Sequence, residues 1–137
     1  MVVTKLIAFG RVLGMMGAAL APVQVSADPG LTLSCLPRAA AVADLCGLMQ
    51  EVIATSLPDR KIARVEAEAQ PDTTPAVRLH VERLTKNGIV ARLDWRQPGE
   101  DWNSGETRAF SVMDRDLHAG MIRGFFQRLW DAGPMVR

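Results

Sequence analysis

The chain has 137 residues, with 16 Lys and Arg against 15 Asp and Glu and a formal net charge of +1. Non-specific nucleic-acid binding depends on an excess of positive charge, so this balance argues against a nucleic-acid partner. The length suits one domain with a core of its own and is too short for two.

Residues 1–27 have the three-part layout of a secretory signal. Lys5 and Arg11 supply positive charge, an uncharged apolar run follows over 12–21, and the segment ends in small residues at Ala27. A permanent membrane helix needs about 20 apolar residues, roughly twice the length of this run. An amphipathic helix of the folded domain is the alternative, but residues 12–21 have no polar face. We therefore predict a signal peptide, a mature domain over 28–137 with no membrane span, and a periplasmic or secreted location.

Without the signal the domain keeps 14 basic and 15 acidic residues, so its charge stays balanced. Residues 31–37 are interpreted as a short lead-in, and residues 39–57 are predicted to form an amphipathic helix. Its buried stripe recurs at spacings of three and four residues: Val42, Leu45, Met49, Val52, Ile53 and Ser56. Pro58 ends the helix, because proline cannot continue the hydrogen-bond ladder.

Cys35 and Cys46 are the chain's two cysteines, and in an exported protein such a pair is usually a disulfide. A bridge requires the helix to start at Ala39 or later, because in a longer helix Cys46 would lie about 14 Å beyond Cys35 at 1.5 Å per residue. Two free buried thiols are the main alternative. A redox-active pair is disfavoured, since the spacing differs from Cys-x-x-Cys.

Four runs of alternating apolar and polar residues follow, and each is predicted to be a half-buried strand. They cover 61–69, 77–82, 89–96 and 106–113, and the last directs Phe110 and Val112 inward. The second and third are predicted to form a hairpin with a three-residue loop at 86–88. That register pairs Val81 with Leu93 and Leu79 with Trp95, and on the outer face it sets Glu82 opposite Arg92 and His80 opposite Asp94.

A second helix is predicted after Asp114 or Asp116, either of which can cap it. Its apolar residues cover a wide arc: Leu117, Met121, Ile122, Phe125, Phe126, Leu129 and Trp130. The order α-β-β-β-β-α with short links predicts an α+β two-layer sandwich. In it, a four-stranded antiparallel meander carries the N-terminal and the C-terminal helix on one face.

Two features of the sequence indicate a binding surface. Trp102 stands in a polar loop, where an aromatic residue either recognises a ligand or folds back as a lid over the core. Arg78, Arg92 and Arg96, with Arg64 as a further member, are predicted to share the uncovered sheet face. The alternative for this face is an ordinary solvated surface whose arginines are balanced by acidic neighbours.

The candidates for chemistry are two small clusters. His80 beside Asp94 resembles a base with its orienting carboxylate, although no serine or cysteine is predicted nearby, and a surface pair is the simpler interpretation. The Asp114 to His118 segment permits a metal site to be drawn, but helix capping accounts for its aspartates and no third ligand has matching spacing. No cofactor, metal or catalytic residue is therefore predicted.

The sequence carries no motif of the common hydrolases or nucleotide-binding proteins. The favoured hypothesis is a small exported, non-enzymatic module that binds a protein partner or assists assembly in the cell envelope, as a monomer or weak homodimer. The alternative is a periplasmic hydrolase or inhibitor acting on envelope polymers or proteins, with His80, Asp94 and His118 as acid–base groups.

Overall fold

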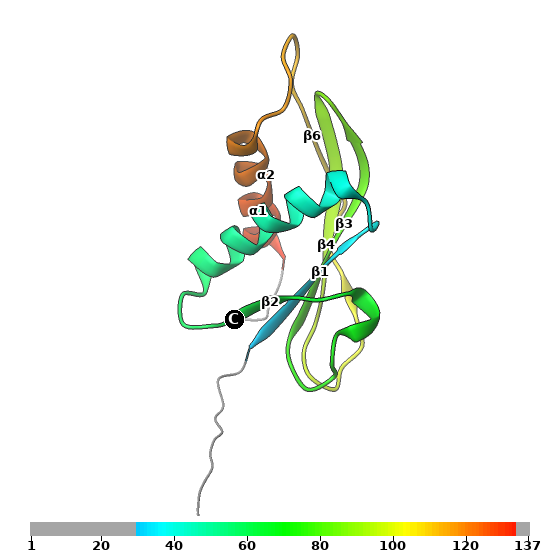
Figure 1. Cartoon of the computed structure of the whole chain (residues 1–137), viewed down its shortest axis with the longest axis vertical. Helices are drawn as coiled ribbons and strands as arrows, with labels where there is room; N and C mark the ends of the chain where they lie inside the picture. Colours follow the sequence, from blue (N-terminus) through cyan, green and yellow to red (C-terminus); the bar gives the residue numbers. More distant parts are fainter. Residues whose placement is uncertain (1–29, 134–137) are drawn as a thin grey trace, which may run out of the picture.

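The computed structural model describes residues 30–133 (Figure 1), and the predicted signal peptide lies outside them. The elements in chain order are β1 (Leu31–Leu36), α1 (Ala40–Ser56), β2 (Ile62–Arg64), a short 3₁₀ helix η2 (Ala67–Ala69), β3 (Ala76–Thr85), β4 (Gly88–Arg96), β5 (Asn103–Ser104), β6 (Arg108–Ser111) and α2 (Ala119–Ala132).

The six strands form one open, mixed sheet in the order β2-β1-β3-β4-β5, with β6 also paired to β4. Strand β1 runs parallel to both β2 and β3, whereas the remaining pairs are antiparallel. The α+β class is confirmed, but the purely antiparallel meander is wrong. Parallel neighbours need a crossover connection, and the segment from α1 through η2 supplies it between β1 and β3.

Strand β1 lies in the segment 31–37, which is predicted as a lead-in without regular structure, and that prediction is wrong. Leu31 and Leu33 are fully buried on the helix side, while Thr32 and Ser34, on the opposite side, are also nearly inaccessible. The six residues alternate as a strand should, but a run this short, next to a turn and a helix, gives a weak signal. With β1 and the two-residue strand β5 included, the order of elements becomes β-α-β-β-β-β-β-α.

The predicted strand over 61–69 is strand only at Ile62–Arg64, and Ala67–Ala69 is the turn of 3₁₀ helix. Its faces are also reversed, because Leu33 pairs with Arg64 and the two share the helix side of the sheet. The Arg64 Nη1 lies 3.6 Å from the place that a Cβ on Gly47 of α1 would take. Arg64 is therefore not on the outer sheet face. Alanine is a weak strand former, so alternation of alanines did not determine the structure here.

The β3–β4 hairpin differs in register from the prediction. Thr85 pairs with Gly88, which leaves Lys86 and Asn87 as a two-residue turn, and the register shifts between Val81 and Arg83. Leu79 therefore pairs with Leu93 and Val81 with Ala91, so the predicted partners are wrong by two residues along β4. With a two-residue turn and an unbroken register, Leu79 and Val81 would lie opposite polar residues of β4. The register shift between Val81 and Arg83 corrects this and keeps the apolar side chains of both strands on one face.

Both helices pack on the same face of the sheet, as predicted, and α1 crosses in front of the strands beside α2 (Figure 1). The core between the layers is made of buried side chains from β1, β3, β4 and both helices. The largest of them are Trp130, Phe126, Leu31, Leu33, Met49, Ile53, Leu79, Ile89, Leu93 and Val77. The predicted stripe of α1 is confirmed from Val42 to Ile53, with Cys46 added to it.

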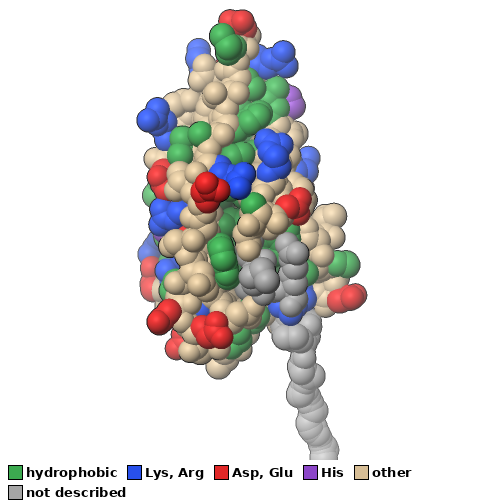
Figure 2. Space-filling model, turned by 180° about the vertical axis from the view of Figure 1, so that it is seen from behind, with side chains coloured by type: hydrophobic (Ala, Val, Ile, Leu, Met, Phe, Trp, Pro, Cys, Tyr) green, Lys and Arg blue, Asp and Glu red, His purple; other side chains and the backbone are tan. Residues whose placement is uncertain are grey.

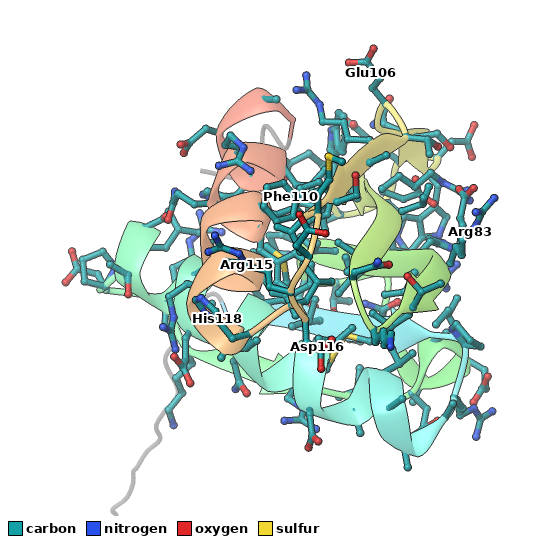
Figure 3. The ribbon with its side chains drawn as sticks, turned by 90° about the horizontal axis from the view of Figure 1, so that it is seen from above. Arg83, Glu106, Phe110, Arg115, Asp116 and His118 are labelled. Atoms are coloured by element: carbon teal, nitrogen blue, oxygen red, sulfur yellow. A yellow bond between two sulfur atoms is a disulfide. The ribbon has the colours of Figure 1, made fainter. Side chains whose placement is uncertain are left out.

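Helix α2 begins at Ala119 with His118 in the N-cap position and no capping side chain, so the predicted caps Asp114 and Asp116 are wrong. The preceding loop is held instead by the hairpin turn, because the Leu117 N–H donates to the Lys86 carbonyl over 2.7 Å. Phe110 points toward α2, and its ring centroid lies 6.0 Å from that of Phe125 (Figure 3).

The predicted bridge between Cys35 and Cys46 is confirmed, with a Cα–Cα distance of 5.8 Å. Helix α1 starts at Ala40, after a turn at Pro37 and Arg38, and so meets the condition that the bridge imposes. The disulfide therefore ties the end of β1 to the second turn of α1.

Candidate binding face of the sheet

The sheet face turned away from the helices, here called the outer face, is polar. It carries Thr32, Ser34, Arg78, His80, Arg92, Asp94 and Arg96, because each is out of phase with the core residues of its own strand. From behind the view of Figure 1, the surface shows basic, acidic and hydrophobic side chains interspersed (Figure 2). Loop residues cover part of the face, and Gln70 and Asp94 are buried.

Trp102 packs on this face against two of the predicted binding arginines. The Cζ of Arg78 lies 4.0 Å, and that of Arg96 4.7 Å, from the centroid of its ring. Both distances are within the range of cation–π attraction. The indole therefore contacts guanidinium groups and not the apolar core, and it stays half-buried. We call Arg78, Arg96 and Trp102 the arginine–tryptophan cluster.

The cluster has little negative charge in contact with it. Arg78 Nε donates to the Gln70 Oε1 and its Nη2 to the Ala67 carbonyl, both neutral acceptors. Arg96 reaches the carboxylate of the exposed Asp72 over 3.3 Å, and its buried Nε has no hydrogen-bond partner within the described part of the chain. Burial first, and the neighbouring Arg96 second, lower the pKa of Arg78. The cluster thus keeps capacity for an added acceptor.

Gln70 joins the covering loop to the sheet, a role that sequence reasoning missed. Its Nε2 donates to the Val77 carbonyl over 3.1 Å and lies 3.4 Å from both oxygens of Thr32, while its Oε1 accepts from Arg78. A lone glutamine before Pro71 carries no sequence signal of its own. Gln70 can bond to both Thr32 and Val77 because β1 pairs with β3, and this pairing is not predicted from the sequence.

Replacement of Gln70 by Ala is expected to lower the free energy of unfolding by about 1–3 kcal/mol, because it leaves buried hydrogen-bonding groups unpaired. Urea denaturation followed by circular dichroism measures the change. Gln127→Ala is the matched control, since the Gln127 amide donates only to Asp131 on the exposed surface of α2. Equal midpoints for the two variants would show that the Gln70 contacts contribute nothing.

The second group on the outer face surrounds Asp94. This buried carboxylate accepts from Arg92 Nε over 3.1 Å, and its second oxygen lies 3.0 Å from His80 Nε2. Arg92 also pairs with Glu82 over 2.7 Å. The predicted neighbours thus meet, although along diagonals of the sheet, because His80 itself pairs with Arg92 and Arg78 with Asp94. Arg92 is consequently engaged by two acidic groups, unlike the arginines of the cluster, and the hydrogen bond to Asp94 is the main cause of its raised pKa.

Burial lowers the pKa of His80 below its ordinary value near 6.5, and the charges of Arg92 and Arg78 act in the same direction. The carboxylate of Asp94 opposes this shift. We expect a proton NMR titration to give a pKa under 6.5, and Asp94→Asn to lower it further. The chain has two histidines, so a His118→Gln background leaves one signal. A pKa that rises in Asp94→Asn would contradict the assignment.

The same shift determines how stability depends on pH. Between the folded-state pKa and 6.5, the unfolded chain binds a proton that folded His80 does not. The free energy of unfolding therefore rises with pH through that window and falls on acidification. His80→Gln should remove this part of the pH dependence in urea titrations.

The described residues assemble no catalytic constellation. Ser34 lies on the outer face opposite Arg78, and the structure shows no hydrogen bond between its hydroxyl and His80. His118 lies at the start of α2, in the helical layer and apart from His80 and Asp94, and Asp116 lies away from it (Figure 3). Within 30–133, no group of three or more His, Cys, Asp or Glu side chains is placed to hold a metal ion.

Neither α1 nor α2 combines the length and the apolarity that a membrane crossing requires. Sequence comparison finds no matching family model and no matching curated protein. The chain is similar in fold to a point variant of PelC from Paraburkholderia phytofirmans, solved as a dodecamer. The two align with a TM-score of 0.52 and 6% sequence identity over 76% of this chain and 85% of that chain.

A homologue of the neuraminyllactose-binding hemagglutinin from Helicobacter pylori aligns over 85% of this chain and 84% of that chain. Its TM-score is 0.29 and its sequence identity 9%, values too low to indicate a shared fold. The PelC comparison shows a shared fold.

Proposed function

We propose that this chain is a small exported, non-enzymatic module that binds a protein partner or supports an assembly in the cell envelope. The observation that carries the proposal is the arginine–tryptophan cluster, a partly accessible aromatic ring with two guanidinium groups; among the described residues, the ion pair of these groups is that of Arg96 with the exposed Asp72. Trp and Arg are the residues that most often dominate binding energy at protein interfaces. A partner surface that presents carboxylates would complete the cluster.

Two further observations support an extracytoplasmic setting, and a third bears on assembly. Residues 1–27 have the layout of an export signal, the described domain contains a disulfide, and such bonds persist in oxidising compartments. The fold is shared with a protein that was solved as a dodecamer. These features favour an envelope protein whose task is contact with other chains.

For the isolated protein we propose a monomer or a weak homodimer. Strand β2, at one edge of the sheet, is only three residues long, ends at Arg64 and is preceded by Lys61, and short charged edges oppose pairing with another copy. The PelC dodecamer shows that a similar fold also builds large assemblies. Sedimentation velocity decides between the two, because a dodecamer-sized species would overturn this part of the proposal.

The binding proposal is tested by capture from a periplasmic extract, with quantification of each partner retained by wild type, Trp102→Ala and Arg96→Gln. Trp102→Ala should abolish retention of the specific partner, and Arg96→Gln should weaken it, because both residues belong to the cluster. Arg115→Gln is the control of matched charge, because Arg115 lies in the exposed loop before α2 (Figure 3). Circular dichroism confirms that each variant is folded. Identical partner lists for all four proteins would count against the outer face.

A hydrolase or inhibitor is the second candidate, and the contact between His80 and Asp94 is the observation in its favour. Nucleophilic catalysis needs a nucleophile within hydrogen-bond reach of the base, and the described residues supply none to His80. An activity screen with glycan and peptide substrates distinguishes the two functions. Turnover that is lost in His80→Gln would support the enzyme, whereas an inert protein agrees with a binding module.

A further inference from the structure

A groove of about 520 Å³ lies between the N-terminal turn of α1 and the end of β2, away from the arginine–tryptophan cluster. Its apolar lining comes from the disulfide, Leu33, Val42 and the small side chains of the first turn of α1. Its charged residues are Arg38, Arg64 and Glu66. A volume of this size is in the range of pockets that hold small ligands or short peptide segments.

One wall of the groove is an unpaired stretch of the β1 edge. On this edge the Leu31 N–H donates to the Lys61 carbonyl and the Leu33 carbonyl accepts from Val65, so alternate residues of β1 face β2. The pairing with β2 ends at Leu33, and Cys35 is the next residue to face this side. Within residues 30–133, neither the N–H nor the C=O of Cys35 forms a backbone hydrogen bond on this edge. The groove therefore contains a free main-chain donor and acceptor.

The charged groups of the groove are unevenly satisfied. Arg38 is engaged by Glu66 over 2.9 Å and by Glu68 over 2.7 Å. Arg64 is exposed and has no ion pair among the described residues. The first turn of α1 contains no acidic residue, and no side chain caps its N–H groups. Glu66 is the acidic residue of the lining and is already engaged by Arg38, so Arg64 is left as a positive group without a counter-charge.

We propose that the groove binds the carboxylate end of an extended peptide with small apolar side chains. The free N–H and C=O of Cys35 match the donor and acceptor of one peptide residue, as in strand addition to a sheet edge. Arg64 and the first turn of α1 complement the terminal carboxylate, and the apolar lining accommodates the small side chains. The charge complementarity favours a peptide terminus over an internal segment, which would bring no carboxylate to Arg64.

The test is an NMR titration of the isotope-labelled protein with the tetrapeptide acetyl-Ala-Val-Ala-Ala, as the free acid and as the C-terminal amide. The acid should shift the amide signals of Cys35 and Ala40 and bind about tenfold more tightly than the amide, the usual effect of a charged hydrogen bond. Arg64→Gln should reduce the affinity for the acid about tenfold and leave that for the amide unchanged. Arg83→Gln, on the exposed part of β3 and outside the groove, is the matched control.

Equal affinities for acid and amide, or no shift at Cys35 at millimolar peptide, would overturn the proposal. Complete displacement of the peptide by an equal concentration of sodium acetate would also overturn it, because it would show a simple anion site. The spectra report folding of each variant directly. The groove shares no residue with the arginine–tryptophan cluster, so a negative result for one site leaves the proposal for the other site unaffected.

Discussion

Replacement of both Cys35 and Cys46 by Ala is expected to lower the free energy of unfolding by about 3 kcal/mol. The bridge closes a loop with a sequence separation of 11, and the loss of chain entropy in the unfolded state accounts for a stabilisation of this size. The bridge also ties β1 to α1, two elements that are otherwise joined through the short turn at Pro37 and Arg38. Urea denaturation under oxidising conditions measures the difference.

A reductant supplies the control for this experiment. Dithiothreitol should shift the urea midpoint of the wild type toward that of the double variant and leave the variant itself unchanged. If the variant and the wild type have the same midpoint, the disulfide does not restrict the unfolded chain as described. A shift of both proteins by the reductant would point to an effect outside this bond.

Phe126→Ala is expected to cost about 3–5 kcal/mol, because it leaves a cavity in a core that cannot collapse around it. Phe126 is fully buried on α2, and its ring centroid lies 6.0 Å from that of Phe125. The thermal midpoint and the urea midpoint should both fall, and partial unfolding at room temperature is consistent with the size of the loss.

Met113→Ala is the control for the core variant. Met113 lies in the loop between β6 and α2 with 83% of its surface exposed, so its truncation should change stability by less than about 0.5 kcal/mol. A loss for Phe126→Ala no larger than that for Met113→Ala would mean that the helical layer does not pack on the sheet as described.

The sequence predicted the elements that have long, regular patterns. Helix α1 was predicted over 39–57 and spans Ala40–Ser56, and the buried side of α2 is the predicted one. The hairpin between β3 and β4 was also predicted, with the correct strands and the wrong register. Each helix repeats one period over more than ten residues, and the two strands of the hairpin are adjacent runs that support each other, so the periodicity outweighs local irregularities.

The errors arose where tertiary contacts decide the structure. The pattern of β1 is only six residues long, and its parallel neighbours lie about thirty to forty-five residues away along the chain. The run over 61–69 alternates correctly but consists largely of alanine on its apolar side, which gives little reason to choose a strand. The irregularity at Val81 and Arg83 leaves no local trace in the sequence.

The sequence predicts which residues form the candidate site, but it does not predict how they are arranged in space. Arg78, Arg92 and Arg96 share one face because β3 and β4 alternate as expected, and His80 meets Asp94. The place of Trp102 over two arginines required the covering loop, which in turn depends on Gln70 and the missed strand. Because strand β1 was not predicted, neither the groove beside the disulfide nor the position of Arg64 on the helix side could be predicted.

The place of β1 between two strands that follow it in sequence has a kinetic consequence. When the chain emerges in order, Leu31–Leu36 has to wait for residues 62–64 on one side and 76–80 on the other before its hydrogen bonds can form. Contacts between residues so far apart in sequence slow folding, because the chain loses entropy on closing the loop before the hydrogen bonds of the pairing form. One edge of β1 stays unpaired until β3, the third strand in the sequence, docks beside it. We therefore expect the docking of β3 to be the step that establishes the native order of strands.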